Sequence, residues 1–206
     1  RRIQNILSLK LIAFNASNLV DSFCNPPLND GVAYQLVKVL FSALEKNCQP
    51  KTEMLFVEWK QLFNLAHDDI SKQQAIIDRK KSLEMLLNYQ FSNRDDEYLA
   101  LYALQTAYEI IIKVIAFKVI SQVRFNASLI SFGESINQES DALRMQLSKL
   151  EDGAIFREYS MANLLEGDFF SWYCAELQWN EEIAECIKKV FEILSRYSDK
   201  AVLNSA

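Results

Sequence analysis

Hydrophobic residues recur along this chain at intervals of three and four, which is the spacing of one face of an α-helix. A first helical pattern begins at Ile3 and stops at Asn25-Pro26-Pro27, because proline cannot continue a helix. We expect Asp30 to cap a second helix over 31–46. Pro50 begins a third helix, in which four large apolar side chains repeat at helical spacing: Met54, Val57, Leu62 and Leu65.

The longest uninterrupted pattern covers 97–124 and is apolar on nearly every side. The preceding residues, 93–96, place negative charge at the positive end of a helix. A helix that is apolar all round is typical of a central element with neighbours on several faces. The β-branched run 110–112 could form a strand, but about 28 residues without a breaker favour a helix.

The other segments also read as helices. A polar segment over 67–90 has one solvated face, 139–159 predicts one further helix, and an aromatic segment over 169–179 precedes a last amphipathic helix over 180–197. Only four glycines and three prolines occur, so few positions can separate short strands. The sequence predicts an all-α fold, an irregular multi-helix bundle around a long central apolar helix over about 97–124.

The 206 residues are expected to form a single helical domain, with an optional subdivision into a helical core over 1–132 and an aromatic-rich part over 133–206. The chain begins with Arg1-Arg2 and not with methionine, which indicates a segment of a longer polypeptide.

Composition narrows the class of partner. The net charge of -5 argues against a nucleic-acid-binding surface over the whole molecule. A local basic run, Arg79-Lys80-Lys81, could still contact DNA phosphates, although a solvated helix face explains it too. The most apolar run, 109–120, contains two lysines and is too short to span a bilayer, so we expect no membrane partner.

The four cysteines form no CxxC pair and have no histidine nearby to complete a zinc site. We expect free, mostly buried thiols in a reducing cytoplasm: Cys24, Cys48, Cys174 and Cys186.

Three short motifs suggest catalysis, and each lacks a necessary part. Asn25-Pro26-Pro27 resembles the tetrapeptide of amino-methylating DNA methyltransferases, but Leu28 offers no aromatic face for a flipped base. His67 is the only histidine, so a multi-histidine metal site or a histidine-based triad has too few ligands or partners. Asp95 has Leu99, and not a carboxylate, one turn later, so helix capping explains the acidic residues better than magnesium binding. We therefore predict no catalytic, cofactor-binding or metal-binding residue in this chain.

Two features suggest contacts with another domain. Lys113 lies in the apolar helix four residues after Glu109, so the two can pair along one face or form a polar seam toward another domain. The aromatic segment is either core packing or an interdomain surface. Its members proposed for interdomain contact are Phe169, Phe170, Trp172 and Trp179.

Three stretches together resemble a helical region of large bacterial restriction-modification DNA methyltransferases. They are FVEWKQLFNLA (56–66), YLALYALQTAYEIIIKVIAFKVIS (98–121) and NLLEGDFFSWYCAELQWNEEI (163–183). In that family the region lies upstream of the adenine-specific methylase domain. The resemblance covers about two thirds of the chain and includes no catalytic motif.

The resemblance implies a parent enzyme of the N-6 DNA methylase type, which transfers a methyl group from S-adenosylmethionine to adenine in DNA and could also cut DNA. Its cofactor loop and catalytic motif would lie beyond Ala206. This segment would then be a non-catalytic, cytoplasmic connector or scaffold that supports the methylase domain and could touch DNA. The alternative is an unrelated all-α protein-protein interaction module.

Overall fold

The computed structural model describes residues 15–26, 28, 30–67, 73–123, 132–158, 160–161 and 169–197. These residues form α-helices and short 3-10 helices, and no β-strand occurs among them, which confirms the all-α prediction. The α-helices are α1 (Ala16–Cys24), α2 (Val32–Lys46), α3 (Pro50–His67), α4 (Gln73–Leu87), α5 (Arg94–Val123), α6 (Ser140–Glu151), α7 (Ala154–Glu158) and α8 (Glu181–Ser195). The 3-10 helices are η2 (Phe132–Asn137) and η3 (Ser171–Cys174).

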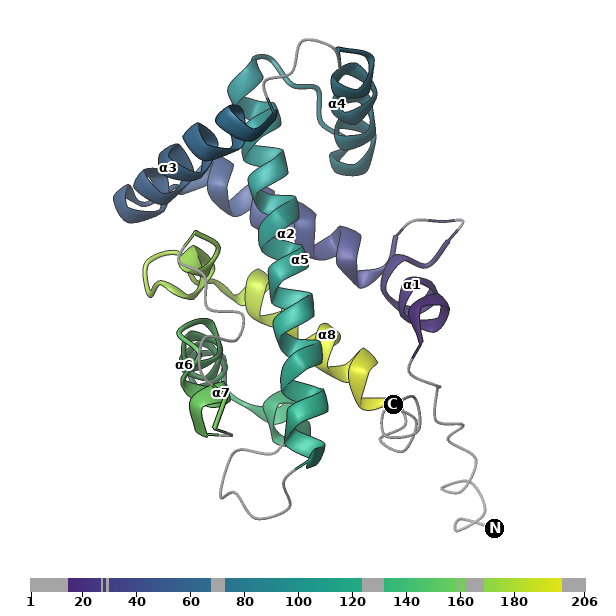
Figure 1. Ribbon diagram of the computed structural model, residues 1–206, viewed down its shortest axis with the longest axis vertical. Coiled ribbons are helices and arrows are strands. Elements are labelled where there is room, and N and C mark those ends of the chain that lie inside the picture. Colours follow the sequence, from purple (N-terminus) through teal and green to yellow (C-terminus); the bar gives the residue numbers. More distant parts are fainter. Residues whose placement is uncertain are drawn as a thin grey trace.

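The long helix α5 is the axis of the fold, as the sequence predicted (Figure 1). Helices α2 and α8 pack against it, α3 and α4 lie at its N-terminal end, and α6 and α7 lie near its C-terminal end (Figure 1). Segments before and after residue 132 contribute to the same buried core. The 110–112 run is helical, and Ile110 lies in that core.

Among the described residues, α5 is the one helix long and apolar enough to cross a membrane by length and composition. Half of its most apolar window is buried against other parts of the chain, and the helix contains the buried Lys113. Both properties are typical of the central helix of a globular core.

The start of α5 is built as its sequence predicts. The Asn93 side chain accepts a hydrogen bond from the Asp96 amide at 2.9 Å, and the Asp96 carboxylate accepts one from the Asn93 amide at 3.3 Å. This reciprocal pair satisfies amides that have no partner within the helix. The acidic residues at 95–97 also complement the helix dipole.

In the connection between α1 and α2, the predicted helix stop is present but the predicted helix cap is not. Asn25 ends α1 in the left-handed conformation, at φ 50° and ψ 59°, so the helix stop at Asn25-Pro26-Pro27 is confirmed. Asp30 does not cap α2 as predicted. Its carboxylate accepts a hydrogen bond from the Asn25 side chain at 2.6 Å, and Gly31 takes the N-cap position. The pattern that begins at Ile3 lies outside the described residues up to position 14.

Two further expectations change. The single helix predicted over 139–159 is two helices, α6 and α7, because Gly153 between them has a φ of 72°. The apolar set predicted on α3 faces outward, since the side that packs on the core carries Leu55, Phe56 and Trp59. In contrast, the α8 stripe is completely buried, and the Asn180 side chain caps that helix as predicted.

Candidate functional site

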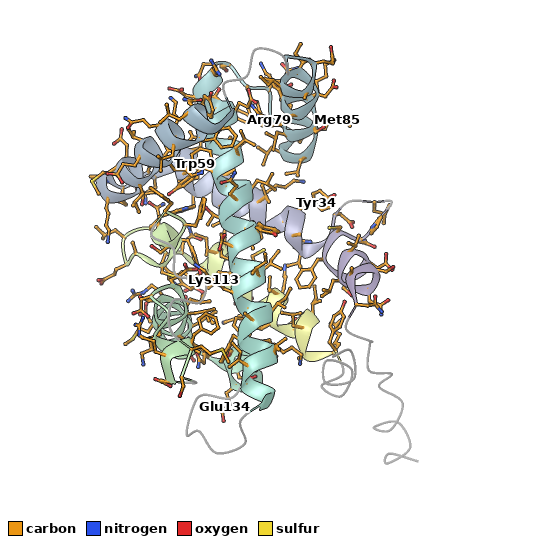
Figure 2. All side chains as sticks on the ribbon, viewed as in Figure 1. Tyr34, Trp59, Arg79, Met85, Lys113 and Glu134 are labelled. Atoms are coloured by element: carbon orange, nitrogen blue, oxygen red, sulfur yellow. The ribbon has the colours of Figure 1, made fainter. Side chains whose placement is uncertain are left out.

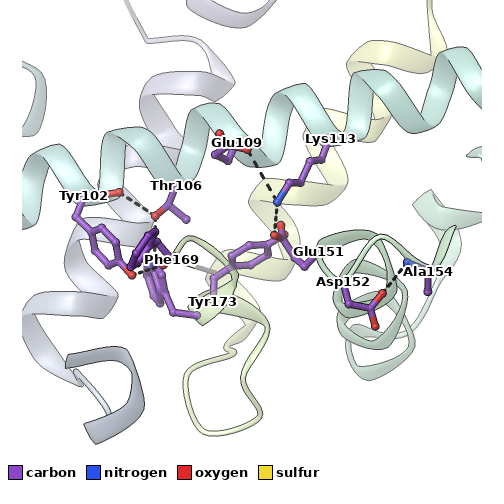
Figure 3. Close-up of polar contacts among 10 residues, drawn as sticks. Tyr102, Thr106, Glu109, Lys113, Glu151, Asp152, Ala154, Phe169 and Tyr173 are labelled. Atoms are coloured by element: carbon purple, nitrogen blue, oxygen red, sulfur yellow. Dashed lines mark hydrogen bonds and ion pairs between the residues drawn. The ribbon is translucent and has the colours of Figure 1, made fainter. Parts of the chain in front are cut away.

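A lysine and a glutamate form an ion pair inside the fold. Lys113 on α5 is 1% exposed, and its Nζ lies 2.6 Å from Oε2 of Glu151 on α6, whose side chain is 3% exposed (Figure 3). Glu109, the partner predicted from spacing, is farther away at 3.9 Å and partly exposed. The pair therefore joins two helices, and the predicted i,i+4 contact is the weaker of the two.

Tyr173 completes this polar cluster from η3. Its hydroxyl donates to Oε1 of Glu151 at 2.7 Å, so each carboxylate oxygen of Glu151 has a partner (Figure 3). Burial, with smaller contributions from Cys174 and Glu151, raises the pKa of Tyr173 well above its usual value. The phenol consequently stays protonated near neutral pH and serves as a hydrogen-bond donor. We call Lys113, Glu151 and Tyr173 the buried polar cluster.

A small cavity of about 210 Å³ lies next to this cluster. It is lined by residues of α3, α6 and η3 that include Thr52, Ser148, Glu151, Trp172 and Cys174. Burial, followed by the nearby Glu151 carboxylate, raises the pKa of the Cys174 thiol far above its usual range. A thiol held in its protonated form is a poor nucleophile, so this arrangement favours packing over covalent chemistry.

Two aromatic residues of the C-terminal third, Phe170 and Trp172, pack around Tyr102 on α5. Its ring centroid lies 5.1 Å from that of Trp59, 5.7 Å from that of Phe170 and 6.1 Å from that of Trp172. The Trp172 indole donates to Thr106 Oγ1 at 2.9 Å. We call these rings the Tyr102 cluster; it brings together α3, α5 and the segment around η3.

The structure separates the five residues proposed for interdomain contact into two groups. Lys113 and Trp172 are buried within this chain, so neither presents a surface to another domain in this conformation. Phe169, Phe170 and Trp179 are partly buried. Trp179 donates to Ser140 Oγ at 2.9 Å, which ties it to α6. For these three residues, interdomain contact stays a prediction.

The three residues of the basic run on α4 lie in different environments. Arg79 packs over the upper end of α5, where its Nε and Nη2 donate to Oε1 of Glu97 at 3.0 and 2.7 Å (Figure 2). Lys80 lies 3.9 Å from Glu84, with 43% of its side chain exposed, and Lys81 is exposed. Arg79 is thus occupied inside the molecule, and the two lysines are the residues of this run that can reach a phosphate.

The remaining motifs have local structural roles. Asp95 forms an ion pair with Lys60, which links the first turn of α5 to the C-terminal half of α3. His67 is the last residue of α3, and its side chain is outside the part of the chain described. No group of three or more histidine, cysteine or acidic residues that could hold a metal occurs among the described residues. The four cysteines are free, and Cys174 and Cys186 are buried.

Sequence reasoning missed a second polar junction, built by Gln178. Its side-chain amide donates to the Asn47 carbonyl at 2.9 Å, and its Oε1 accepts from Thr52 Oγ1 and from the Gln49 amide, each at 3.2 Å. Gln178 is 2% exposed and fastens the loop before α8 to the junction of α2 and α3. The available signal was a single amide side chain inside an aromatic segment, which periodicity does not distinguish from a surface residue.

Comparisons with protein-family models, with curated proteins and with solved structures find no match to this chain.

Proposed function

We propose that this chain is a helical support domain of a bacterial restriction-modification DNA adenine methyltransferase. In this proposal the attached methylase domain binds S-adenosylmethionine and methylates adenine, and the helical domain holds it in position in the cytoplasm. No residue described here is assigned to the cofactor or to the reaction. The basis for the family is the resemblance of the stretches 56–66, 98–121 and 163–183.

One observation carries the proposal: the described parts of these three stretches meet in the Tyr102 cluster. Trp59 comes from the first stretch, Tyr102 from the second, and Phe170 and Trp172 from the third. The three stretches that resemble the family therefore pack against one another and belong to a single structural unit. This supports the view that the resemblance concerns one folded region and not scattered helical composition.

The buried polar cluster supports a structural role. Lys113, Glu151 and Tyr173 come from α5, α6 and η3, and every charged group among them has a partner within the chain. Removing one member of a buried ion pair is strongly destabilising, and in this proposal the complete pair fixes how α5 and α6 meet. A rigid junction of this kind suits a domain that positions another domain.

Contact with DNA is a smaller part of the proposal. Lys80 and Lys81 are on the exposed side of α4 and could each touch a phosphate. The net charge of -5 makes such contacts local.

An unrelated protein-protein interaction module is the second candidate. Four large apolar side chains exposed on one side of α3 favour it, because grouped apolar residues on a surface often mark a binding site.

The natural full-length protein tests the proposal through transfer of labelled methyl groups from S-adenosylmethionine to adenine-containing duplex DNA. We expect N6-methyladenine in the product, and no transfer by residues 1–206 alone. Absence of methylation by a folded full-length protein that binds no S-adenosylmethionine would overturn the proposal and favour the interaction module.

A further inference from the structure

Helix α3 carries two apolar faces, and the fold covers only one of them. Leu55, Phe56 and Trp59 are buried against the core, between 5% and 9% exposed. The other face keeps large apolar side chains in solvent: Met54 at 53%, Val57 at 44%, Leu62 at 54% and Leu65 at 85% exposed. We call these four residues the outer face of α3.

The outer face has the spacing of a docking surface. Its members repeat at intervals of three to five residues over three helical turns, so they lie on one side of α3. The same kind of stripe on α8 is fully buried, with Ile183, Ile187 and Val190 at 0% exposed. Isolated apolar residues on a surface need no explanation, but four large apolar side chains exposed on one side of a helix mark a candidate binding surface.

The charges on this face are mainly acidic. Glu53 and Glu58 line a shallow depression of about 530 Å³ together with Met54 and Val57. Neither glutamate forms an ion pair with another residue of the described parts of the chain, although Glu97 and Glu151 do. Lys51 is a cation at the first turn.

These charges indicate which kinds of partner the outer face of α3 can bind. Carboxylates on the face repel DNA phosphates and anionic lipid headgroups, and they attract lysine and arginine. A symmetric antiparallel pair of α3 helices centred on the outer face would bring Glu58 within about one helical turn of its own copy, because Glu58 lies near the middle of the span from Met54 to Leu65. Like charges at that position oppose self-association.

We propose that the outer face of α3 binds a basic amphipathic helix from another domain or protein. Apolar side chains of that helix cover Met54, Val57, Leu62 and Leu65, and its lysine or arginine residues lie beside Glu53 and Glu58. This docking mode is a helix laid along an exposed helix face. It does not depend on the methyltransferase assignment, because methyl transfer and helix binding are measured separately.

The probe is a synthetic amphipathic helix of about three heptads, with leucine at the a and d positions and lysine at e and g. A matched peptide carries glutamate at e and g. Fluorescence anisotropy with the 206-residue chain should give at least about tenfold tighter binding of the lysine peptide. Equal affinity for the two peptides would overturn the proposal.

Substitutions on α3 and at control positions test where on the chain the lysine peptide binds. Met54→Gln/Leu65→Gln should weaken binding of the lysine peptide at least about tenfold, whereas Met85→Gln, a change at a residue 83% exposed on α4, should leave it unchanged. Glu53→Lys/Glu58→Lys should reverse the peptide preference. The matched charge change at exposed sites elsewhere, Glu176→Lys/Glu192→Lys, should not.

Circular dichroism establishes that each variant is folded. An equal loss of binding in Met85→Gln would contradict the assignment to α3, as would a reversal by Glu176→Lys/Glu192→Lys. Light scattering provides a further test: a doubled molar mass that Leu65→Gln abolishes would show a second copy as the occupant and overturn the proposal.

Discussion

The Nζ atom of Lys113 lies 2.6 Å from Oε2 of Glu151, and both side chains are almost completely removed from solvent. This single contact joins the central helix α5 to α6. Tyr173 adds η3 to the junction through the other oxygen of Glu151. The ionisable side chains of Lys113, Glu151 and Tyr173 are therefore engaged in contacts between α5, α6 and η3.

Removing one member of this ion pair should lower the free energy of unfolding far more than replacing both members with apolar residues. We expect Lys113→Met to lower the free energy of unfolding by about 3–5 kcal/mol, because Glu151 would be left buried without its cation. Lys113→Met/Glu151→Met should recover most of that loss. Urea denaturation of the single and double variants measures the coupling, and additive losses would contradict a coupled pair.

Alkaline pH should destabilise the fold through its buried tyrosines. Burial is the largest cause of the raised pKa of Tyr102 and Tyr173, so the folded state keeps both protons above the unfolded pKa of about 10. Below that pH both states are protonated and stability does not change with these groups. Above it only the unfolded state releases protons, so each tyrosine should lower stability by about 1.4 kcal/mol per pH unit.

Tyr102→Phe isolates one of these contributions. The slope of unfolding free energy against pH above 10 should become shallower by about 1.4 kcal/mol per unit. Tyr108→Phe, a change at a residue 63% exposed, is the control and should keep the original slope. The same slope in Tyr102→Phe and the unaltered chain would show that Tyr102 ionises freely in the folded state.

The sequence predicted the fold through periodicity and missed features that depend on distant neighbours. The central helix, the start of α5 and the buried stripe of α8 follow from local spacing and capping residues. The break at Gly153 was missed because a positive φ at one glycine is not visible in hydrophobic spacing. Which apolar side of α3 faces inward was also invisible, since both sides carry large apolar residues at helical intervals.

The polar interior shows the same limit. Spacing identified Lys113 and its helical neighbour Glu109, but the dominant partner is 38 positions away along the chain. Nothing local to Glu151 or Gln178 marks either residue as buried, because their burial comes from elements packed over them. Long-range pairing of polar groups therefore had to be read from the structure.

Gly31 should tolerate no side chain. A Cβ atom at this position would lie 2.1 Å from the Phe23 carbonyl oxygen, so the α1–α2 connection would have to move. We expect Gly31→Ala to cost about 1–3 kcal/mol of unfolding free energy. Asp30→Ala, which removes only an exposed hydrogen bond to Asn25, should cost less than about 1 kcal/mol. Thermal denaturation compares the two variants, and equal stability of Gly31→Ala and the unaltered chain would contradict the close approach.

Within the basic run on α4, Arg79 should contribute to stability, whereas Lys80 and Lys81 should contribute to DNA binding. Arg79→Gln leaves the buried Glu97 without its cation and should lower stability by about 1–3 kcal/mol. Lys80→Gln/Lys81→Gln should leave stability nearly unchanged. If these lysines contact phosphates, the same change should weaken duplex binding. The slope of log affinity against log salt concentration should then become shallower by about 0.9 for each phosphate that is no longer neutralised.

Anisotropy titrations of labelled duplex DNA at several salt concentrations measure that slope, and urea denaturation measures stability in parallel. Unchanged affinity in the double lysine variant would remove DNA contact from the proposed role. Unchanged stability in Arg79→Gln would show that its pairing with Glu97 contributes little.

The most direct measurement is methyl transfer to DNA by the full-length protein carrying Lys113→Met/Glu151→Met. If the buried polar cluster is structural and the chain supports an attached methylase domain, this variant should remain folded and transfer methyl groups at close to the unaltered rate. A folded, stable double variant that has lost methyl transfer would place these residues in the reaction and contradict the account.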